Sequence, residues 1–504
     1  MYRLICVYLI LAGAMAWKPV VLTAHNETRS LIEQRTEIET SLSLLHLADA
    51  ERQITAMSSK PWQAYYRAHL PIYKYFATQD PAYAQTLRTN WDATIASVSA
   101  LPATDPLRNV LLAELNCKRS FIEFLDENYL AATRYGRAGR SLIMQNQQKF
   151  PDNIDQKKTL GLMNVLLGSI PAKYQWVTGS LGFTGDLDAG VQQLQEFAAK
   201  GSLLRMEAQV ILFVVEKNML NRTDLAIKRI ETERKRYTSP NIMLDFLQAS
   251  AHLSIKQNDA GLGVLARKSQ YINAGKAFFI PYWDYLLGKG HYYKDDLPNA
   301  QMYLAQFLRG YKGKLFRADA NFRLGMALTM SGAYTVGKTF FKSVISSAGG
   351  FDEDEYAKHM ANKFLTIPPS TQAISLFKAR NLFDGGYFEK AITVLRDLEA
   401  AGLSKLSVDD RAELYYRYGR IYHSQGKLAI ASSYYRRCVN EPSSSESQWL
   451  QAYSYSYMGD IARQSGNSPT AKVNYEKALS YNGYFYQSGL QNRCKVALSE
   501  LKKI

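Results

Sequence analysis

Residues whose side chains could carry out chemistry are few and scattered in this chain of 504 residues. The seven histidines stand singly, and none lies in a His-Glu-x-x-His motif or in a zinc-binding Cys/His spacing. No Gly-x-Ser-x-Gly motif, kinase motif set or dinucleotide-binding fingerprint is present. We therefore expect a protein that is not an enzyme, with no catalytic residue, no metal site and no cofactor.

The four cysteines do not predict a reactive site either. Cys6 lies in the apolar N-terminal segment, and Cys117, Cys438 and Cys494 are too few for a disulfide framework. We expect Cys438 to pack as a small apolar residue. A bridge between Cys438 and Cys494 is left open by the sequence.

One pattern of small and aromatic residues occurs twice between Glu413 and Leu479, with an offset of 40 residues. The spacing within each copy is that of the tetratricopeptide repeat, a helical hairpin with a usual period of about 34 residues. The polar segment Glu441–Gln448 contains a proline and accounts for the longer period as an extended turn. The matched positions are Tyr415, Tyr418, Gly419, Tyr422, Gly426, Ala431, Tyr435 and Cys438 in the first copy, and Tyr455, Met458, Gly459, Ala462, Gly466, Ala471, Tyr475 and Ala478 in the second.

The small members of this pattern let the two helices of a hairpin approach closely, and a large residue fills the next gap. The expected packing positions are Gly419, Ala431 and Tyr435 in the first copy, and Gly459, Ala471 and Tyr475 in the second. Further hairpins in the same register precede them. The sequence therefore predicts an all-α solenoid of tetratricopeptide-like helical hairpins, wound as a right-handed superhelix.

Two segments of turn-forming residues divide the chain, Phe150–Asn153 and Ile367–Ser370. We expect an N-terminal helical region of degenerate repeats or a cap over 17–150, helical hairpins over 151–366, and C-terminal repeats over 367–504. Ser370 is expected to cap the following helix. Helices of the N-terminal region are expected over Glu27–Leu45, Trp62–Phe76, Tyr83–Val98, Pro106–Leu125 and Tyr129–Gln148, and a final capping helix over Gln487–Lys502.

Residues 1–16 have the features of a secretory signal peptide. Arg3 supplies the positive start, an apolar run follows, and Ala14 and Ala16 form a small-x-small cleavage site. Lys18 and Pro19 end the apolar run too early for a membrane span of about 20 residues. We expect cleavage and a periplasmic or secreted protein, with an intracellular protein as the alternative.

The formal net charge of +16 is spread along the chain in segments that mix both signs. No basic block or RNA-binding aromatic motif is present, so no nucleic acid partner is expected. Arg134, Arg137 and Arg140 follow one predicted helix, where arginines more often cover a helix face than mark an anion site. Anionic partners such as lipid headgroups, acidic glycans or acidic proteins fit this charge.

A short motif adds a family resemblance. Ile170 and Pro171 precede the segment Leu181–Asp186, and Gly190 and Leu194 follow it. This order resembles the tetratricopeptide-repeat protein 39 family and its fungal inclusion-body-clearance relatives, which implies an apolar helix and then C-terminal repeats. The signal-like N-terminus departs from that largely intracellular family. Asp186 itself is expected to be a helix N-cap.

Tyrosine is abundant, with 34 residues, and four tyrosines fall outside the packing positions of the repeat. Tyrosine offers both apolar area and a hydroxyl to a peptide or a sugar. We expect an exported scaffold that binds protein or peptide partners at the cell envelope through a concave repeat surface. The alternative is a carbohydrate- or nutrient-binding envelope protein, and the oligomeric state is not predicted. The possible ligand-face residues are Tyr416, Tyr434, Tyr453 and Tyr484.

Overall fold

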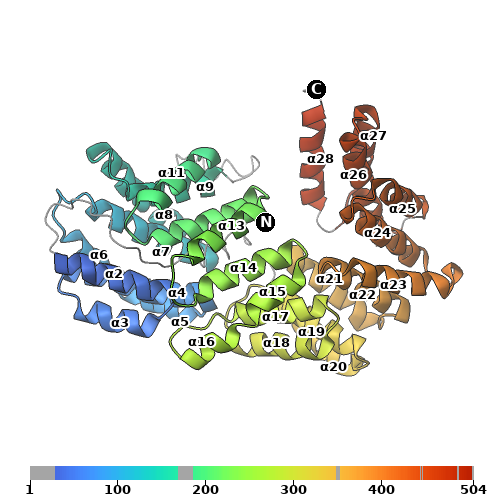
Figure 1. Ribbon diagram of the computed structural model, residues 1–504, viewed down its shortest axis with the longest axis horizontal. Coiled ribbons are helices and arrows are strands. Elements are labelled where there is room, and N and C mark those ends of the chain that lie inside the picture. Colours follow the sequence, from blue (N-terminus) through green and yellow to red (C-terminus); the bar gives the residue numbers. More distant parts are fainter. Residues whose placement is uncertain are drawn as a thin grey trace. The chain divides into compact units, whose positions relative to one another are not determined.

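The computed structural model describes residues 29–168, 185–347, 352–442, 444, 447–484 and 487–501. These residues form helices joined by short turns, and no strand occurs among them (Figure 1). The expected all-α class and the arrangement of consecutive helices as hairpins are confirmed. Ala14 and Ala16, the expected cleavage residues, and the motif segment 170–184 lie outside the described residues.

The chain forms two compact units. Unit 1 comprises residues 1–255, 260–286 and 309–313, and unit 2 comprises residues 256–259, 287–308 and 314–504. The sequence break after residue 150 falls inside unit 1, and the break after residue 366 falls inside unit 2. The division of the chain by contacts therefore differs from the division by turn-forming segments.

The helices of unit 1 are α2 (Arg29–Ser43), α3 (Leu47–Ala56), α4 (Lys60–Thr78), α5 (Pro81–Thr89), α6 (Trp91–Ser99), α7 (Arg108–Leu125), α8 (Tyr129–Lys149), α9 (Gln156–Gly168), α11 (Leu187–Lys200), α12 (Arg205–Val214), the π-helix η2 (Val215–Met219), α13 (Thr223–Arg234), α14 (Ile242–Ser254), α15 (Asn258–Leu265) and α16 (Lys268–Ala274). The boundary between the units passes through α15, α17 (Tyr282–Tyr293) and α18 (Leu297–Gly310).

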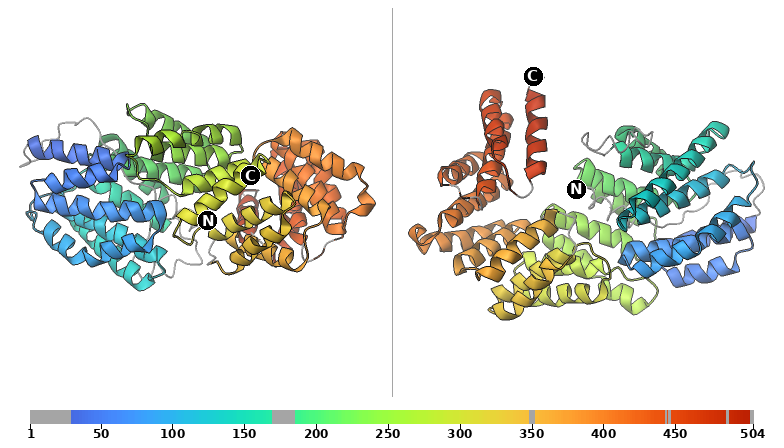
Figure 2. Two further views of the ribbon diagram at one scale, coloured as in Figure 1. Left: turned by 90° about the horizontal axis from the view of Figure 1, so that it is seen from below. Right: turned by 180° about the vertical axis from the view of Figure 1, so that it is seen from behind.

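The helices of unit 2 are α19 (Arg317–Met330), α20 (Tyr334–Ile345), α21 (Asp352–Thr366), α22 (Thr371–Asp384), α23 (Phe388–Ala400), the 3-10 helix η3 (Leu403–Lys405), α24 (Val408–Ser424), α25 (Leu428–Asn440), α26 (Gln448–Gln464), α27 (Ser468–Leu479) and α28 (Gln487–Leu501). Successive pairs such as α24 with α25 and α26 with α27 pack as hairpins, which Figure 2 shows from two further sides. Helix α25 ends at Asn440 and α26 begins at Gln448, so the segment expected as an extended turn lies between these two helices apart from Gln448 itself.

Both expected N-caps are confirmed. The Asp186 carboxylate accepts a hydrogen bond from the backbone N–H of Ala189 at 3.0 Å, at the start of α11. The Ser370 hydroxyl accepts one from the N–H of Ala373 at 3.1 Å, at the start of α22. Each cap satisfies a backbone donor that has no partner within its own helix.

One expected helix of unit 1 is divided in two. The prediction of a single helix over Tyr83–Val98 is wrong, because α5 ends at Thr89 and α6 begins at Trp91. At the junction, the side-chain amide of Asn90 donates to the carbonyl of Thr86 at 2.9 Å. Asparagine readily hydrogen-bonds nearby backbone in this way and competes with helix continuation.

The core of unit 2 is rich in aromatic rings. Phe322 lies 5.9–6.5 Å, between ring centroids, from Phe341, Phe364 and Phe377. A second cluster connects α22 through α26, and a third connects α26 to α28. The small residues Ala431 and Ala471 are fully buried in these two clusters.

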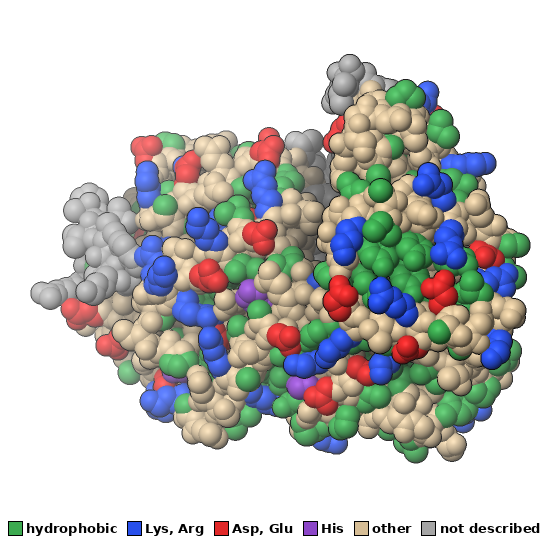
Figure 3. Space-filling view, turned by 45° about the vertical axis from the view of Figure 1, so that its right-hand side comes forward, with side chains coloured by type: hydrophobic (Ala, Val, Ile, Leu, Met, Phe, Trp, Pro, Cys, Tyr) green, Lys and Arg blue, Asp and Glu red, His purple; other side chains and the backbone are tan. Residues whose placement is uncertain are grey.

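Charged side chains are distributed over the surface. Figure 3 shows Lys and Arg side chains mixed with Asp and Glu on the visible face, without a single large basic block. None of the helices within the described ranges is both long enough and apolar enough to span a bilayer.

Candidate functional site

The repeat glycines lie where the helices of a hairpin come closest. A Cβ atom on Gly419 would lie 2.5 Å from Cε1 of Tyr435, and one on Gly459 would lie 2.6 Å from Cε1 of Tyr475. Both tyrosine rings are fully buried. These distances are far below van der Waals contact, so glycine is needed at both positions while the rings stay in place.

The four tyrosines proposed as a ligand face do not share one surface. Tyr416 is only 2 % exposed, so its expected surface position is wrong: Trp449 of the next hairpin covers it, with ring centroids 5.3 Å apart. Tyr434 is half-buried on α25, Tyr453 is half-buried on α26, and Tyr484 is half-buried after α27. The position of Tyr416 was predicted wrongly because the repeat pattern describes packing within one hairpin. It does not show which residues the next hairpin covers.

Unit 2 contains a cavity of about 200 Å³. It opens among α17, α19, α21 and α22, and three of its side chains are cationic and two are carboxylates. The lining residues are Lys289, Tyr292, Tyr293, Asp319, Phe322, Arg323, Tyr356, Phe377, Arg380, Asn381 and Asp384.

The wall formed by α17 and α19 combines a guanidinium group with two aromatic rings. Cζ of Arg323 lies 5.6 Å from the ring centroid of Tyr292 and 5.4 Å from that of Tyr293. Nε of the same arginine donates to the buried Asp319 carboxylate at 2.6 Å. Nζ of Lys289 lies 5.7 Å from the Tyr293 ring centroid. The rings and the carboxylate therefore hold the cations of this wall in defined positions.

The lining residues on α21 and α22 repeat this arrangement. The Arg380 guanidinium lies 4.7 Å from the Tyr356 ring centroid, donates to the Tyr356 hydroxyl, and pairs with Asp384 at 3.8 Å. A pairing at that distance is weak.

Two of the lining residues are buried polar groups. Asn381 is 4 % exposed and Tyr292 is 2 % exposed. Burial raises the pKa of the Tyr292 hydroxyl to about 12, and the neighbouring Asn381 side chain opposes this rise. Nδ2 of Asn381 has no hydrogen-bond partner of normal geometry in the described chain. Burying such a donor without an acceptor is costly, so this amide favours an acceptor group entering the cavity.

The cavity residues escaped the sequence analysis although their positions carry a signal. Lys289 and Arg380 of the cavity, and Arg420 outside it, each directly follow the small residue at the eighth place of a hairpin. On a helix, that ninth place lies beside the closely packed position and faces the next hairpin. A basic residue recurring there is a pattern that the packing positions alone do not reveal.

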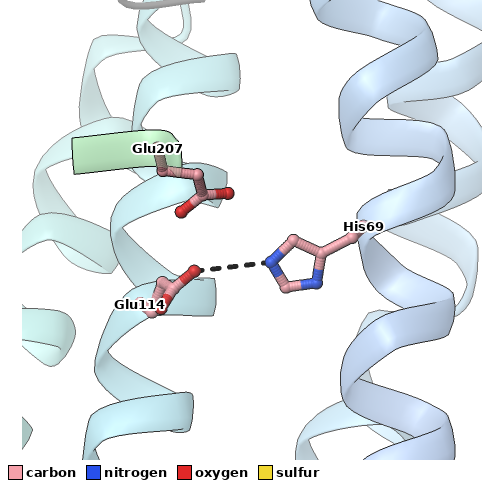
Figure 4. A group of neighbouring side chains, drawn as sticks. All are labelled: His69, Glu114 and Glu207. Carbon is pink, nitrogen blue, oxygen red and sulfur yellow. Dashed lines mark hydrogen bonds and ion pairs between the residues drawn. The ribbon is translucent and has the colours of Figure 1, made fainter. Parts of the chain in front are cut away.

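Unit 1 contains a buried cluster of charged residues from α4, α7, α9 and α12. Figure 4 shows the His69 ring directed at Glu114, with Glu207 beside them. Nζ of Lys118 lies 2.6 Å from Glu114 Oε1 and 2.7 Å from His69 Nε2. Nζ of Lys158 lies 2.8 Å from Glu207 Oε2 and 3.0 Å from Glu114 Oε2. Two ammonium groups thus join two carboxylates below the surface.

Burial and pairing act in opposite directions on these groups. Burial raises the pKa of the Glu114 carboxyl, but Lys118 and Lys158 together hold it well below its usual value. Burial and the Lys118 charge lower the pKa of His69. Because His69 Nδ1 faces the Tyr65 carbonyl at 2.8 Å, the neutral ring carries its proton there and accepts from Lys118 at Nε2.

The same cluster has the residue types of a metal site. Ligand atoms of His69, Glu114 and Glu207 lie within 4.8 Å of one another. However, the Lys118 ammonium is within 2.7 Å of a ligand atom of each. The positive charge that a metal ion would supply is already present at the centre, so the cluster is an ion-pair network that links the helices.

The cysteines pack as apolar residues. Cys438 and Cys494 are buried free thiols, so the bridge between them that the sequence left open is not formed. Burial raises the pKa of Cys438 to about 12, which keeps the thiol protonated and unreactive.

Comparison with known proteins identifies one segment. Residues 412–441 match the family model of the tetratricopeptide repeat. These residues cover most of α24 and all of α25, including the contact between Gly419 and Tyr435. A comparison of the chain with curated proteins finds no match. The chain therefore carries a tetratricopeptide repeat within an array of helical hairpins.

Proposed function

We propose that this protein is a non-enzymatic scaffold that binds a protein or peptide partner through the first helices of the hairpins in unit 2. The observation that carries the proposal is the cavity between these helices, in which Arg323 and Arg380 are held against tyrosine rings. Tetratricopeptide repeats generally mediate protein–protein contacts, and the proposal extends that role to this chain.

The chemistry of the cavity favours an acidic group on the partner. Its cations are Lys289, Arg323 and Arg380, and its carboxylates are Asp319 and Asp384. Asp319 already neutralises Arg323, and Asp384 pairs only loosely with Arg380. A partner carboxylate would compete with Asp384 for Arg380 while its carbon chain lies against the rings.

Selection from a random peptide library on the immobilised protein tests this proposal. We expect enrichment of peptides that carry Asp or Glu next to an apolar residue. Loss of one charge-assisted hydrogen bond costs about 1.5–3 kcal/mol. Arg380→Ala should therefore raise the dissociation constant of the peptide by roughly 10–100-fold. Arg437→Ala on α25, which removes an exposed arginine outside the cavity, is the matched control. Enriched peptides without acidic residues, or equal binding to both variants, would overturn the proposal.

Export is a separate part of the proposal. The apolar segment that ends at Ala16 supports secretion to the periplasm or beyond, where a partner at the cell envelope would be met. N-terminal sequencing of the protein from its native cells should begin at Trp17. A chain that retains Met1 would refute export and favour the intracellular relatives that the Leu181–Asp186 segment resembles.

Carbohydrate binding is the second candidate, and one observation favours it. The half-buried ring of Tyr434 stacks on Tyr418 at 4.7 Å and on Tyr422 at 5.6 Å, between centroids. A flat stack of this kind suits the apolar face of a sugar ring. Binding of an oligosaccharide should persist in 1 M salt, where the Debye length is about 3 Å, and should be lost in Tyr434→Ala. Loss of binding in salt would exclude this mode.

A further inference from the structure

The turn between α7 and α8 in unit 1 exposes a group of large apolar side chains. Leu130 is 88 % exposed, Tyr129 is 51 % exposed and Phe124 is 39 % exposed. The rings of Phe124 and Tyr129 touch edge to face, with centroids 5.7 Å apart, and Leu130 directly follows Tyr129 in the chain. Single exposed apolar residues are common on proteins, but a contiguous exposed group marks an interaction site.

A row of arginines begins at this patch. Leu130, Arg134 and Arg137 are spaced by four and three residues, so they share one face of α8, and all three are exposed. Helix α8 carries three Arg and one Lys and no Asp or Glu, which gives it a formal charge of +4. The guanidinium of Arg134 lies 4.7 Å from the Tyr135 ring centroid, which holds it along the helix surface.

The carboxylates near the turn only partly offset this charge. Asp126 pairs with Arg88 and accepts a hydrogen bond from the Tyr75 hydroxyl at 2.6 Å. Arg88 also forms a two-pronged ion pair with Glu123. Glu127 is exposed at the turn itself. The apolar patch therefore sits at the end of a helix whose exposed face is cationic.

We propose that the α7–α8 turn docks onto an anionic lipid bilayer, with Phe124, Tyr129 and Leu130 inserted among the headgroups. An apolar end that continues into a basic row matches the two layers of an anionic membrane surface. Interfacial segments bury their apolar side chains about 5–10 Å deep. Arginines close to an anionic surface are attracted to it. This surface belongs to unit 1, and its role does not depend on peptide binding by unit 2.

Flotation of the full-length protein with lipid vesicles tests the proposal. We expect the protein to float with vesicles of phosphatidylglycerol and phosphatidylcholine in equal amounts, and at least tenfold less with vesicles of phosphatidylcholine alone. Leu130→Glu should lose at least nine-tenths of the binding. Arg134→Glu together with Arg137→Glu should lose a similar share, and raised salt should weaken the wild type.

Val473→Glu is the matched control, because Val473 is 63 % exposed on α27, far along the chain from the turn. Its binding should equal that of the wild type. Since Leu130 is exposed, Leu130→Glu should keep the wild-type melting temperature, which circular dichroism checks. A fluorophore on Leu130→Cys that shifts to the blue with anionic vesicles, and not on Val473→Cys, would locate the contact. Equal binding to neutral and anionic vesicles, no binding at all, or wild-type binding of Leu130→Glu would overturn the proposal; the last result would point to docking of a protein partner instead.

Discussion

The two units are built from the same kind of helix but are held together by different interactions. In unit 1, buried carboxylates and ammonium groups of Glu114, Glu207, Lys118 and Lys158 join helices that are distant in sequence. In unit 2, aromatic rings connect neighbouring hairpins, and glycines such as Gly419 let the two helices within a hairpin pack closely. The first mode fixes one particular arrangement of helices, and the second can be repeated hairpin after hairpin.

This difference explains why one unit carries a recognisable sequence pattern and the other does not. Ring-on-glycine packing recurs at fixed spacing, so it leaves a period in the sequence. A buried ion-pair network occurs once and needs residues such as Lys158 and Glu207 that are 49 positions apart. It leaves no period, so its existence becomes visible only in three dimensions.

The largest expected effect follows from removing one charge from the network of unit 1. Lys158→Met leaves Glu114 and Glu207 buried with one ammonium group fewer, which should cost about 3–5 kcal/mol. Lys157→Met is the matched control, since its ion pair with Glu196 is partly exposed and worth about 0–1 kcal/mol. Chemical denaturation measures the free energy of unfolding of each variant. For Lys158→Met, hydrogen exchange should also show lost protection in α9 and α12. Equal effects of the two variants would refute the structural role of the network.

The next effect is a pH dependence at Glu39, which is buried in unit 1. Burial raises the pKa of this carboxyl from about 4.5 to about 7, against the lowering effects of Arg35 and of hydrogen bonds from Tyr66 and Leu204. The folded protein therefore holds this proton more tightly than the unfolded chain, so its contribution to stability is present below about pH 4.5 and is lost as the pH rises through 7.

Comparison with Glu39→Gln isolates this contribution. One pKa unit corresponds to about 1.4 kcal/mol, so the stability of the wild type relative to the variant should fall by roughly 2–3 kcal/mol between pH 5 and pH 8. Urea denaturation at a series of pH values measures it. A difference that stays constant, or that grows with pH, would show that the carboxyl is not buried in this way.

In unit 2, the repeat glycines should give a smaller effect. Gly419→Ala places a methyl group against the Tyr435 ring and should cost about 1–3 kcal/mol, and Gly459→Ala should cost a similar amount. Gly489→Ala in α28 has open space and is the control, with an expected gain of about 0.5–1 kcal/mol. Thermal melting compares the three. A neutral Gly419→Ala would mean that the hairpins are not packed this closely.

The smallest effect should be the same in both units. Asp186→Ala in unit 1 and Ser370→Ala in unit 2 each remove an N-cap and should cost about 1 kcal/mol. Caps act locally, so the interactions that hold each unit together should not change this cost. Hydrogen exchange of the first turns of α11 and α22 measures it. Markedly different costs in the two units would show that the caps are coupled to the surrounding packing.

Local signals in the sequence predicted the helical class, the repeat and the caps at Asp186 and Ser370, because each depends on neighbouring residues or on a fixed period. The burial of Tyr416 was missed, since Trp449 from the next hairpin covers it. The cavity was missed for the same reason: Arg323 and Arg380 stand on separate hairpins, and only stacking brings them to one space. Sequence periodicity describes one hairpin, whereas a binding surface is made by several.

The central claim, partner binding in the cavity of unit 2, is tested most directly by photo-crosslinking in the native cells. p-Benzoylphenylalanine would replace Phe377, which is half-buried and lines the cavity, or Ile367, which is 68 % exposed outside it. We predict one defined protein adduct at position 377, none at position 367, and loss of the adduct when Arg380→Ala is added. The same adduct from both positions, or an adduct that persists without Arg380, would contradict the account.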